Sequence, residues 1–364
     1  MSSPEATRGP AGVDLVVIGD ANPDVLVIGD DVTPEFGQKE KLVRSGSLAV
    51  GGSAAITAVA AARLGLSVAL VAAIGPDPAG EFMRSELARA GVDTSSLAVR
   101  AAEPTGLTVV LTGGTDRAIL TAVGAIGSLT ASDVPVALLA GARHVHVSSY
   151  FLMADSLGPG LAGLLAGARA GGATTSLDTN WDPAQRWDDP RLRAALAQAD
   201  LLLPNEAEAV ALAGERDLAG AVAVLAGRDG PAGRDGPAGP GGARRVVVKL
   251  GARGALCVER GRQVRVSLPP VTPVDDTGAG DCFNAGLITG LLLGLDLPGA
   301  AALGCAAGAL STQAPGGTGS CPDLATASAL AAKATAGEAA APEATVREAA
   351  DLEATALAAD ETAG

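Results

Sequence analysis

Residues 273–284 read PVDDTGAGDCFN, and they place three carboxylates around a Gly-Ala-Gly turn just before an apolar run. Gly278, Ala279 and Gly280 can bring consecutive backbone N–H groups together without obstruction by side chains. The apolar run that follows predicts a helix, whose positive dipole end would point at the same turn. The stretch therefore predicts an anion site built from backbone groups.

Asp281 follows this turn, in the first turn of the predicted helix. If the turn holds a phosphoryl group, a carboxylate beside it is positioned to take a proton from an attacking hydroxyl. The alternative is structural, because a carboxylate at a helix start commonly accepts hydrogen bonds from the first backbone N–H groups. From these residues alone, both roles of Asp281 stay open.

Three motifs of other ligand-binding enzymes are missing from the sequence. A Walker loop requires a lysine after a glycine, and no glycine precedes any of the four lysines, Lys39, Lys41, Lys249 and Lys333. The first apolar run ends in Gly-Asp-Ala-Asn-Pro, which is not the dinucleotide fingerprint GxGxxG. HExxH is excluded because the two histidines are His144 and His146, whose alternation along an apparent strand favours a core or surface role.

Length and charge limit the domain organisation and the class of partner. A chain of 364 residues can form one large domain or two ordinary ones. Hydrophobic residues make up 48% of it but aromatic residues only 2%, so we expect a core of Ala, Val and Leu. The formal net charge of -14 disfavours contact with phosphate backbones, and we expect no nucleic-acid partner.

The termini and the cysteines indicate where the protein is located. The first residues lack a basic and apolar leader, and the apolar stretch after Gly286 is interrupted by Asp296 and Pro298. We therefore expect a cytoplasmic protein without a membrane partner. The widely spaced cysteines predict reduced, mostly buried thiols rather than disulfides or a zinc site; they are Cys257, Cys282, Cys305 and Cys321.

Strand-like and helix-like patterns alternate along most of the chain. Residues 13–19 predict a buried strand, residues 51–65 (GGSAAITAVAAARLG) a tightly packed helix, and the following SVALVAAIG another strand. The alternation continues to the long helix after Asp281. It predicts an α/β fold with a central, mainly parallel sheet and helices on both faces.

Other segments fall outside this pattern. A hairpin is predicted around Gly113-Gly114, and we expect residues of about 25–50 and 99–125 to form a small antiparallel β lid. Tandem GRDGPA repeats predict a flexible insertion at 227–242. An Ala- and Glu-rich tail, 326–364, is expected to be partly helical and partly disordered, which leaves one domain over 13–325.

Three motifs in chain order resemble the ribokinase-like family of carbohydrate and nucleoside kinases, also called the PfkB family. They are the Gly51-Gly52 pair that opens an early helix, the NEAE of residues 205–208 after a strand, and DDTGAGDCF of residues 275–283. The resemblance extends from about Val13 to Asp323. It implies a ribokinase-like fold, the cofactors ATP and Mg²⁺, and phosphorylation of a hydroxyl of a small neutral sugar, expected to be a hydroxymethyl group.

The resemblance also implies roles for individual residues on the nucleotide side. Asp281 matches the general base, and the backbone of residues 278–280 matches the anion hole. Asn205 and Glu208 match the NxxE motif that organises Mg²⁺ and the ATP phosphates, largely through water; a solvated helix start is the alternative. In the family, a strand and a turn lie beneath the nucleotide, and the matching positions here are Lys249, Gly251 and Gly254. The alternative is an ordinary turn at the end of a strand, which has the same pattern.

On the substrate side, the resemblance implies contacts with the sugar from Asn22, Asp24, Gly51, Gly52 and Asn180. Two positions depart from the family pattern. Ile56 stands where sugar kinases of the family commonly carry an Asn, so a hydrogen bond to the substrate is lost or supplied elsewhere. Asp182 replaces the Arg of a DxNxR stretch, which argues against anionic substrates because the reversed charge would repel them.

Alternatives remain within and beyond this class. A nucleoside kinase of the same family is the second reading, for which Ile56 and Phe36 permit an apolar stacking surface. A non-catalytic sugar- or nucleoside-binding relative is the contrasting reading, and a dehydrogenase is the third. The resemblance also leaves open a monovalent-cation requirement around Asp275, and it favours a homodimer through exposed lid strands.

Overall fold

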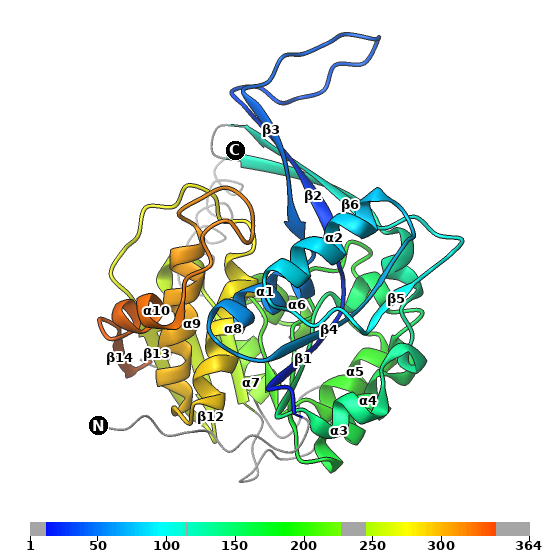
Figure 1. Ribbon diagram of the computed structural model, residues 1–364. Coiled ribbons are helices and arrows are strands. Elements are labelled where there is room, and N and C mark those ends of the chain that lie inside the picture. Colours follow the sequence, from blue (N-terminus) through cyan, green and yellow to red (C-terminus); the bar gives the residue numbers. More distant parts are fainter. Residues whose placement is uncertain (1–11, 114–115, 227–244, 340–364) are drawn as a thin grey trace, which may run out of the picture.

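The computed structural model describes residues 12–113, 116–226 and 245–339. Within these residues a ten-stranded sheet runs in the order β14-β13-β12-β11-β10-β9-β8-β1-β4-β5 (Figure 1). All neighbours from β11 to β5 pair in parallel, whereas β11 to β14 pair antiparallel. The expected α/β fold with a mainly parallel sheet is confirmed.

The strands of this sheet are short and rich in Val and Leu. β1, β4 and β8 are buried along their whole length, because helices cover both faces of the sheet. The strands are β1 (Leu15–Ile18), β4 (Val68–Ile74), β5 (Leu97–Val99), β8 (His144–Val147), β9 (Thr174–Leu177), β10 (Leu201–Leu202), β11 (Arg245–Lys249), β12 (Ala255–Glu259), β13 (Arg262–Ser267) and β14 (Thr335–Glu338).

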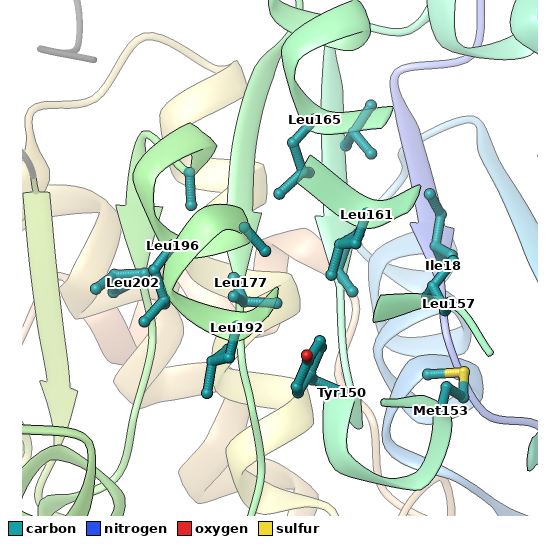
Figure 2. Close-up of a cluster of buried hydrophobic side chains, with 14 of the residues drawn as sticks. Ile18, Tyr150, Met153, Leu157, Leu161, Leu165, Leu177, Leu192, Leu196 and Leu202 are labelled. Atoms are coloured by element: carbon teal, nitrogen blue, oxygen red, sulfur yellow. The ribbon is translucent and has the colours of Figure 1, made fainter. Parts of the chain in front are cut away.

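Alternate residues of β1 belong to two different hydrophobic core clusters, one on each face of the sheet. Leu15 and Val17 join the core that contains α1 (Ser53–Arg63), α2 (Pro78–Arg89), α8 (Ala279–Leu292), α9 (Leu297–Ser311) and α10 (Leu324–Ala331). Val16 and Ile18 join the core with α3 (Val136–Gly141), α4 (Gly158–Ala170), α5 (Pro190–Gln198), α6 (Glu206–Ala213) and α7 (Leu218–Ala226). Figure 2 shows leucines of α4 and α5 packed over β9 and β10 in this second core.

Small residues bring α8 close to its neighbours. A Cβ added to Gly286 would lie 2.7 Å from the carbonyl oxygen of Leu303, and one added to Gly304 would lie 2.8 Å from that of Phe283. Helix α1, whose buried face is largely alanine, packs against α8 from the other side. The chain poor in aromatic residues therefore gains its density from close helix contacts, and these hold the amino ends of α1 and α8 side by side.

A second sheet projects from the body in the order β3-β2-β6-β7 (Figure 1). Its strands are β2 (Asn22–Gly29), β3 (Ser45–Gly51), β6 (Leu107–Gly113) and β7 (Asp116–Ala122). The segments expected to form a flap thus do form a separate sheet. The expectation that it is antiparallel is wrong for one pair, because β2 and β6 run parallel. Gly114, in the turn of the predicted β6–β7 hairpin, lies outside the described residues.

The end of the described chain differs from the predicted tail. Ala327 of α10 is fully buried, and β14 pairs with β13 at the edge of the central sheet. The domain therefore continues to at least Glu338 and does not end at 325. The predicted insertion at 227–242 and the rest of the predicted tail, 340–364, lie outside the described residues.

The cysteines are buried, as expected, and of the core and surface roles left open for the histidines the structure shows the core role. All four cysteines are free, and both histidines of β8 are hydrogen-bonded in the core: His146 bonds the hydroxyls of Ser176 and Ser148 at 2.7 and 2.9 Å. Among the described residues, no helix is both long enough and apolar enough to cross a membrane.

Candidate active site

The candidate residues meet at the carboxyl edge of the parallel strands. Asp20 follows β1, Asp178 follows β9, and Lys249 ends β11, while α1, α6 and α8 begin at the same edge. A hydrogen bond from Thr57 of α1 to the carbonyl of Asp281 (3.4 Å) links two of these helices. Ligands of open α/β sheets bind at this edge, so the position agrees with a functional site.

The turn before α8 has the shape that the sequence predicts. Gly278 is the N-cap residue with a φ of 71°, and a Cβ there would lie 2.7 Å from the Cα of Gly317. The Ala279 N–H donates to the Asp276 carbonyl at 3.2 Å. The N–H groups of the next two residues belong to the first turn, which a helix does not satisfy internally, so they can face an anion.

Asp281 is the third residue of α8, and the cap of this helix is made without a side-chain hydrogen bond. The helix-capping role, which the sequence left open for Asp281, is therefore excluded. The residue is 7% exposed, and burial raises the pKa of its carboxyl well above the usual value, with a further rise from Asp178. Lys249 and the Ser53 hydroxyl oppose that rise. A carboxyl with a raised pKa is suited to general-base work near neutral pH.

Lys249 does not extend toward the predicted nucleotide turn. Its buried ammonium forms an ion pair with Asp178, and Asn284 of α8 donates to the same carboxylate oxygen at 2.6 Å. The sequence reading missed the roles of Asp178 and Asn284. A signal for Asn284 was available, because it lies three residues after Asp281 and so shares its face of the helix.

Asp24 and its neighbours form the base of the second sheet. The Asp24 carboxylate lies against Gly51, where an added Cβ would be 1.9 Å from Oδ1. The Asn22 amide donates to Asp24 Oδ1 at 3.2 Å and to Thr108 Oγ1 at 3.0 Å. Burial, together with the charges of Asp20 and Asp275, raises the pKa of Asp24 to about 7. Sequence reasoning missed Thr108, whose place opposite Asp24 follows from strand pairing.

Gly52 and Asp20 shape the start of α1. Gly52 has a φ of 84°, and a Cβ there would lie 2.9 Å from the Asp20 carbonyl oxygen. The Asp20 carboxylate, which sequence reasoning also missed, accepts the N–H groups of Ser53 and Ala54 at 3.2 and 2.9 Å. This tight turn brings the Ser53 hydroxyl to Asp281.

Asn180 supports Ser53 from the central sheet. It has a φ of 56°, accepts the Ser149 N–H at 2.8 Å and donates to Ser53 Oγ at 2.9 Å. The side chain expected to contact substrate is thus already bonded within the protein. Its place beside Ser53 still puts it at the same site as Asp281 and the start of α1.

The two departures from the family pattern have structural explanations. Ile56 is 3% exposed, and its side chain lies 3.1 Å from where a Gly278 Cβ would be and 2.4 Å from where a Gly317 Cβ would be. Ile56 therefore supports the turn at residues 278–280 by packing. Asp182 is fully buried, and its carboxylate accepts the backbone N–H groups of Ala184 and Arg186. The expected repulsion of anionic substrates by Asp182 is therefore wrong, because its charge is held inside its own loop.

Asn205 and Glu208 begin α6 as a capping box. Asn205 Oδ1 accepts the Glu208 N–H at 2.9 Å, and Glu208 Oε2 accepts the Asn205 N–H at 2.8 Å. Glu208 is only 4% exposed, so the alternative of a solvated helix start is wrong. Burial and the charge of Asp178 raise the pKa of Glu208 to about 7.

These residues fit Mg²⁺ held largely through water. In the described chain no three or more His, Cys, Asp or Glu side chains form a ready metal cage. Mg²⁺ commonly keeps several waters and uses one or two carboxylates. Glu208 is a buried carboxylate under repulsion from another acid, which a divalent cation would relieve.

Gly251 and Gly254 form a short turn after β11. Gly251 has a φ of 59° and is exposed; Gly254 has a φ of 89°, and a Cβ there would lie 2.0 Å from the Val266 carbonyl oxygen. Arg253 in this turn pairs with Glu206 of α6. The turn therefore lies on an open rim beside the NxxE helix, where a nucleotide can approach.

The second sheet packs over the loop that follows α9. Added to Gly316, a Cβ would lie 3.2 Å from side-chain atoms of both Leu26 and Ala49. The Gly316 N–H donates to Asp275 at 2.8 Å. Phe36, expected as a stacking surface for a nucleoside, is instead 97% exposed in the loop between β2 and β3.

Comparisons with known proteins agree with this geometry. The sequence profile of the pfkB family carbohydrate kinases matches residues 13–324. A fructokinase of Klebsiella pneumoniae is 33% identical over 66% of this chain and 76% of its own length. A ribokinase of Haemophilus influenzae is 29% identical over 85% of this chain and 95% of its own length.

A solved structure extends the likeness to three dimensions. A protein described as Ribokinase II from E. coli, in complex with ATP and Mg²⁺, is 25% identical and has a TM-score of 0.73. The match covers 87% of this chain and 98% of that chain. The ribokinase-like fold expected from the sequence is thereby confirmed.

Proposed function

The chain belongs to the pfkB family of carbohydrate kinases, and from this membership we propose how its residues transfer a phosphoryl group. It is a phosphotransferase that uses ATP to phosphorylate a sugar. In the proposed reaction the acceptor is a hydroxyl of a small neutral sugar, expected to be a hydroxymethyl group. The observation that carries the proposal is the buried Asp281 carboxylate directly after the Gly278 turn.

Asp281 takes the proton from the sugar hydroxyl, and the oxygen attacks the γ-phosphorus of ATP. The bond from this phosphorus to the bridging oxygen breaks, and ADP leaves with that oxygen. The first-turn N–H groups after Gly278 face the transferring phosphoryl group and hold it in line. Mg²⁺, held through water by Glu208, neutralises charge on the phosphates when it is bound.

The charge of the pocket supports a neutral acceptor. Three acidic side chains are buried at the site, those of Asp20, Asp24 and Asp281. A second anion, such as a sugar phosphate, would be repelled there. Asp24 and Asn22 offer an acceptor and a donor for sugar hydroxyls, as the fructokinase and ribokinase relatives would need for their substrates.

Cofactors and location complete the proposal. Besides ATP and Mg²⁺, we propose that a monovalent cation binds near Asp275, whose carboxylate already orders Gly316 and Thr277 by hydrogen bonds. We also propose a cytoplasmic location, where ATP is supplied. The partners are then small molecules, with neither nucleic acid nor membrane required.

A homodimer through the second sheet is proposed from exposed apolar side chains. Phe36 and Leu42 are 97% and 89% exposed in the loop between β2 and β3, and Leu48 of β3 is 49% exposed. Apolar groups on an edge strand favour pairing with another chain. Light scattering of the wild type and of Phe36→Asp with Leu42→Ser tests this: the wild type is expected at twice the mass of the variant, and equal masses would contradict it.

The test of the function is ADP release from Mg-ATP over neutral sugars, sugar acids, sugar phosphates and nucleosides. We expect turnover with a neutral sugar and a fall in kcat of at least about 100-fold in Asp281→Asn. Full activity in that variant would remove Asp281 as the base. Turnover only with a nucleoside would replace the substrate class, and ATP binding without any turnover would support the non-catalytic reading.

Two additions test the cations. Excess EDTA is expected to abolish turnover, and added Mg²⁺ to restore it. Replacing K⁺ by a bulky organic cation at constant ionic strength is expected to lower the rate. An unchanged rate would rule out the monovalent site at Asp275.

A further inference from the structure

Lys249 is a buried cation that joins three elements beneath the site. Its side chain is 13% exposed, and its ammonium pairs with Asp178, which is fully buried at the end of β9. The Asn284 amide donates to the same Asp178 oxygen at 2.6 Å. The ends of β9 and β11 are thereby fixed to α8, one turn after Asp281.

The ammonium lies directly behind the anion-binding turn. Added to Gly280, a Cβ would be 3.6 Å from Lys249 Nζ and 3.8 Å from Lys249 Cδ. Gly280 is the residue before Asp281, and its N–H is one of the groups that can face the phosphoryl oxygens. A full positive charge therefore lies a few ångströms behind the N–H groups, in an interior where salt screens little.

The Lys249 ammonium interacts electrostatically with several buried carboxylates. Asp178, Glu208 and Asp281 are all buried, and all three lie within electrostatic reach of Lys249. Charge that develops on the transferring phosphoryl group would meet the field of the same ammonium.

We propose that Lys249 is a positioning residue for phosphoryl transfer: its ammonium, held by Asp178 and Asn284, fixes the turn at Gly280 and stabilises transition-state charge through it. This inference rests on the proposed function of the turn. The competing role is structural, in which Lys249 only neutralises the buried carboxylate of Asp178.

The two roles differ in what happens when both charges are removed. Lys249→Met alone leaves Asp178 buried and unpaired, so a loss of activity there has two explanations. In Lys249→Met with Asp178→Asn neither charge remains, and we expect thermal stability to recover relative to the single variant. The expected kcat of the double variant stays about 100-fold below wild type, with KM for sugar and for ATP within about 3-fold.

A kcat within about 3-fold of wild type in the double variant would overturn the inference, because Lys249 would then only neutralise Asp178. A fall in kcat matched by an equal rise in KM for ATP would also overturn it. A second double variant, Lys249→Gln with Asp178→Asn, can keep a hydrogen bond between the two side chains and serves if the Met form does not fold.

Arg245→Met is the matched control. Arg245 starts the same strand and pairs with Glu259 at 2.7 Å, away from the turn, so its loss is expected to leave kcat unchanged. Asp281→Asn separates this inference from the proposed function. If Asp281→Asn is slow and the Lys249 double variant is fast, only the role of Lys249 fails; if Asp281→Asn is fast, the proposed base fails.

Discussion

Arg117 of β7 forms an ion pair with Asp276, which lies five residues before Asp281 in the loop that leads to the anion turn. The same guanidinium donates to Thr277 Oγ1 at 3.1 Å and lies 3.9 Å from Asp275. The second sheet is thus tied to the loop that precedes the turn. Closing of the sheet over a substrate and ordering of the turn would then occur together.

Arg117→Ala is expected to raise KM for the sugar and to lower kcat, together by about 10-fold in kcat/KM, because the sheet loses its contact with the loop. Stability should change by less than about 1 kcal/mol, since the pair is partly exposed. Initial rates and thermal unfolding measure both. Arg44→Ala removes another ion pair of the second sheet, with Asp30, and should leave the rates unchanged. Equal losses in the two variants would contradict a specific role of Arg117.

Gly278→Ala is expected to abolish most activity. The substitution meets both a φ of 71° and a backbone atom of Gly317 at 2.7 Å, so the turn must shift. Gly294→Ala shares the positive φ, 85°, but has no atom within 4 Å of the added Cβ. Gly294→Ala therefore measures only the free-energy cost of an alanine at positive φ, about 1 kcal/mol, and should have the kcat of the wild type. Equal kcat values for the two variants would show that the shape of the Gly278 turn is unimportant.

Ile56→Ala tests whether packing supports the anion turn. Loss of the buried side chain should cost about 2–4 kcal/mol in the free energy of unfolding. It should also lower kcat, because Gly278 and Gly317 lose their contact with it. Leu64→Ala, at the other end of α1 and 2% exposed, should destabilise similarly without changing kcat. The measurements are urea unfolding and steady-state rates; a normal kcat in Ile56→Ala would limit Ile56 to stability.

Asp24→Asn is expected to raise KM for the sugar while stabilising the unliganded protein at alkaline pH. Burial raises the pKa of Asp24 from 3.8 to about 7. Its contribution to stability is therefore fully present below pH 3.8 and is lost as the pH rises through about 7. Relative to Asp24→Asn, the wild type should lose stability between these pH values. Parallel stability curves for the two proteins from pH 5 to pH 8 would contradict the raised pKa.

The two histidines should make the protein sensitive to acid. Burial lowers the pKa of His144 to about 3 and that of His146 to about 4, from 6.5. Their neutral forms stabilise the fold above pH 6.5, and this contribution falls by roughly 1.4 kcal/mol per pH unit for each histidine as the pH drops toward 4. Carboxyl groups whose pKa is raised, such as that of Asp24, change the stability in the opposite direction as the pH falls. The measurement is therefore the difference in the free energy of unfolding between the wild type and a double variant, His144→Gln with His146→Gln, as a function of pH. A difference that does not vary with pH would contradict the lowered pKa values of the two histidines.

The fold class and the main motifs could be predicted because their signals are local. Alternating apolar runs marked the strands and helices, and the glycines of residues 278–280 marked a turn before a helix. The Gly51-Gly52 pair marked the start of a helix, and α1 begins directly after it. Each of these features depends on residues a few positions apart.

Other parts of the site depend on which strands become neighbours. Lys249 is 71 positions from Asp178 in the sequence, and Asn284 is 106 positions from it. Both side chains nevertheless bind the Asp178 carboxylate. The same reason explains the misplaced domain end, because β14 pairs with β13, which is distant in the sequence. The error at Asp182 is local: its carboxylate accepts the N–H groups of Ala184 and Arg186 in its own loop, which the charge pattern alone did not show.

The α/β sheet and the glycine turn at 278–280 followed by Asp281 could be predicted from the amino-acid sequence, because glycine geometry and hydrophobic periodicity act over short distances. The positions of Lys249 near Gly280 and of Ile56 against Gly278 follow from the three-dimensional packing. Strand order and close helix packing bring these side chains into contact with the turn, and neither can be predicted from the spacing of neighbouring residues.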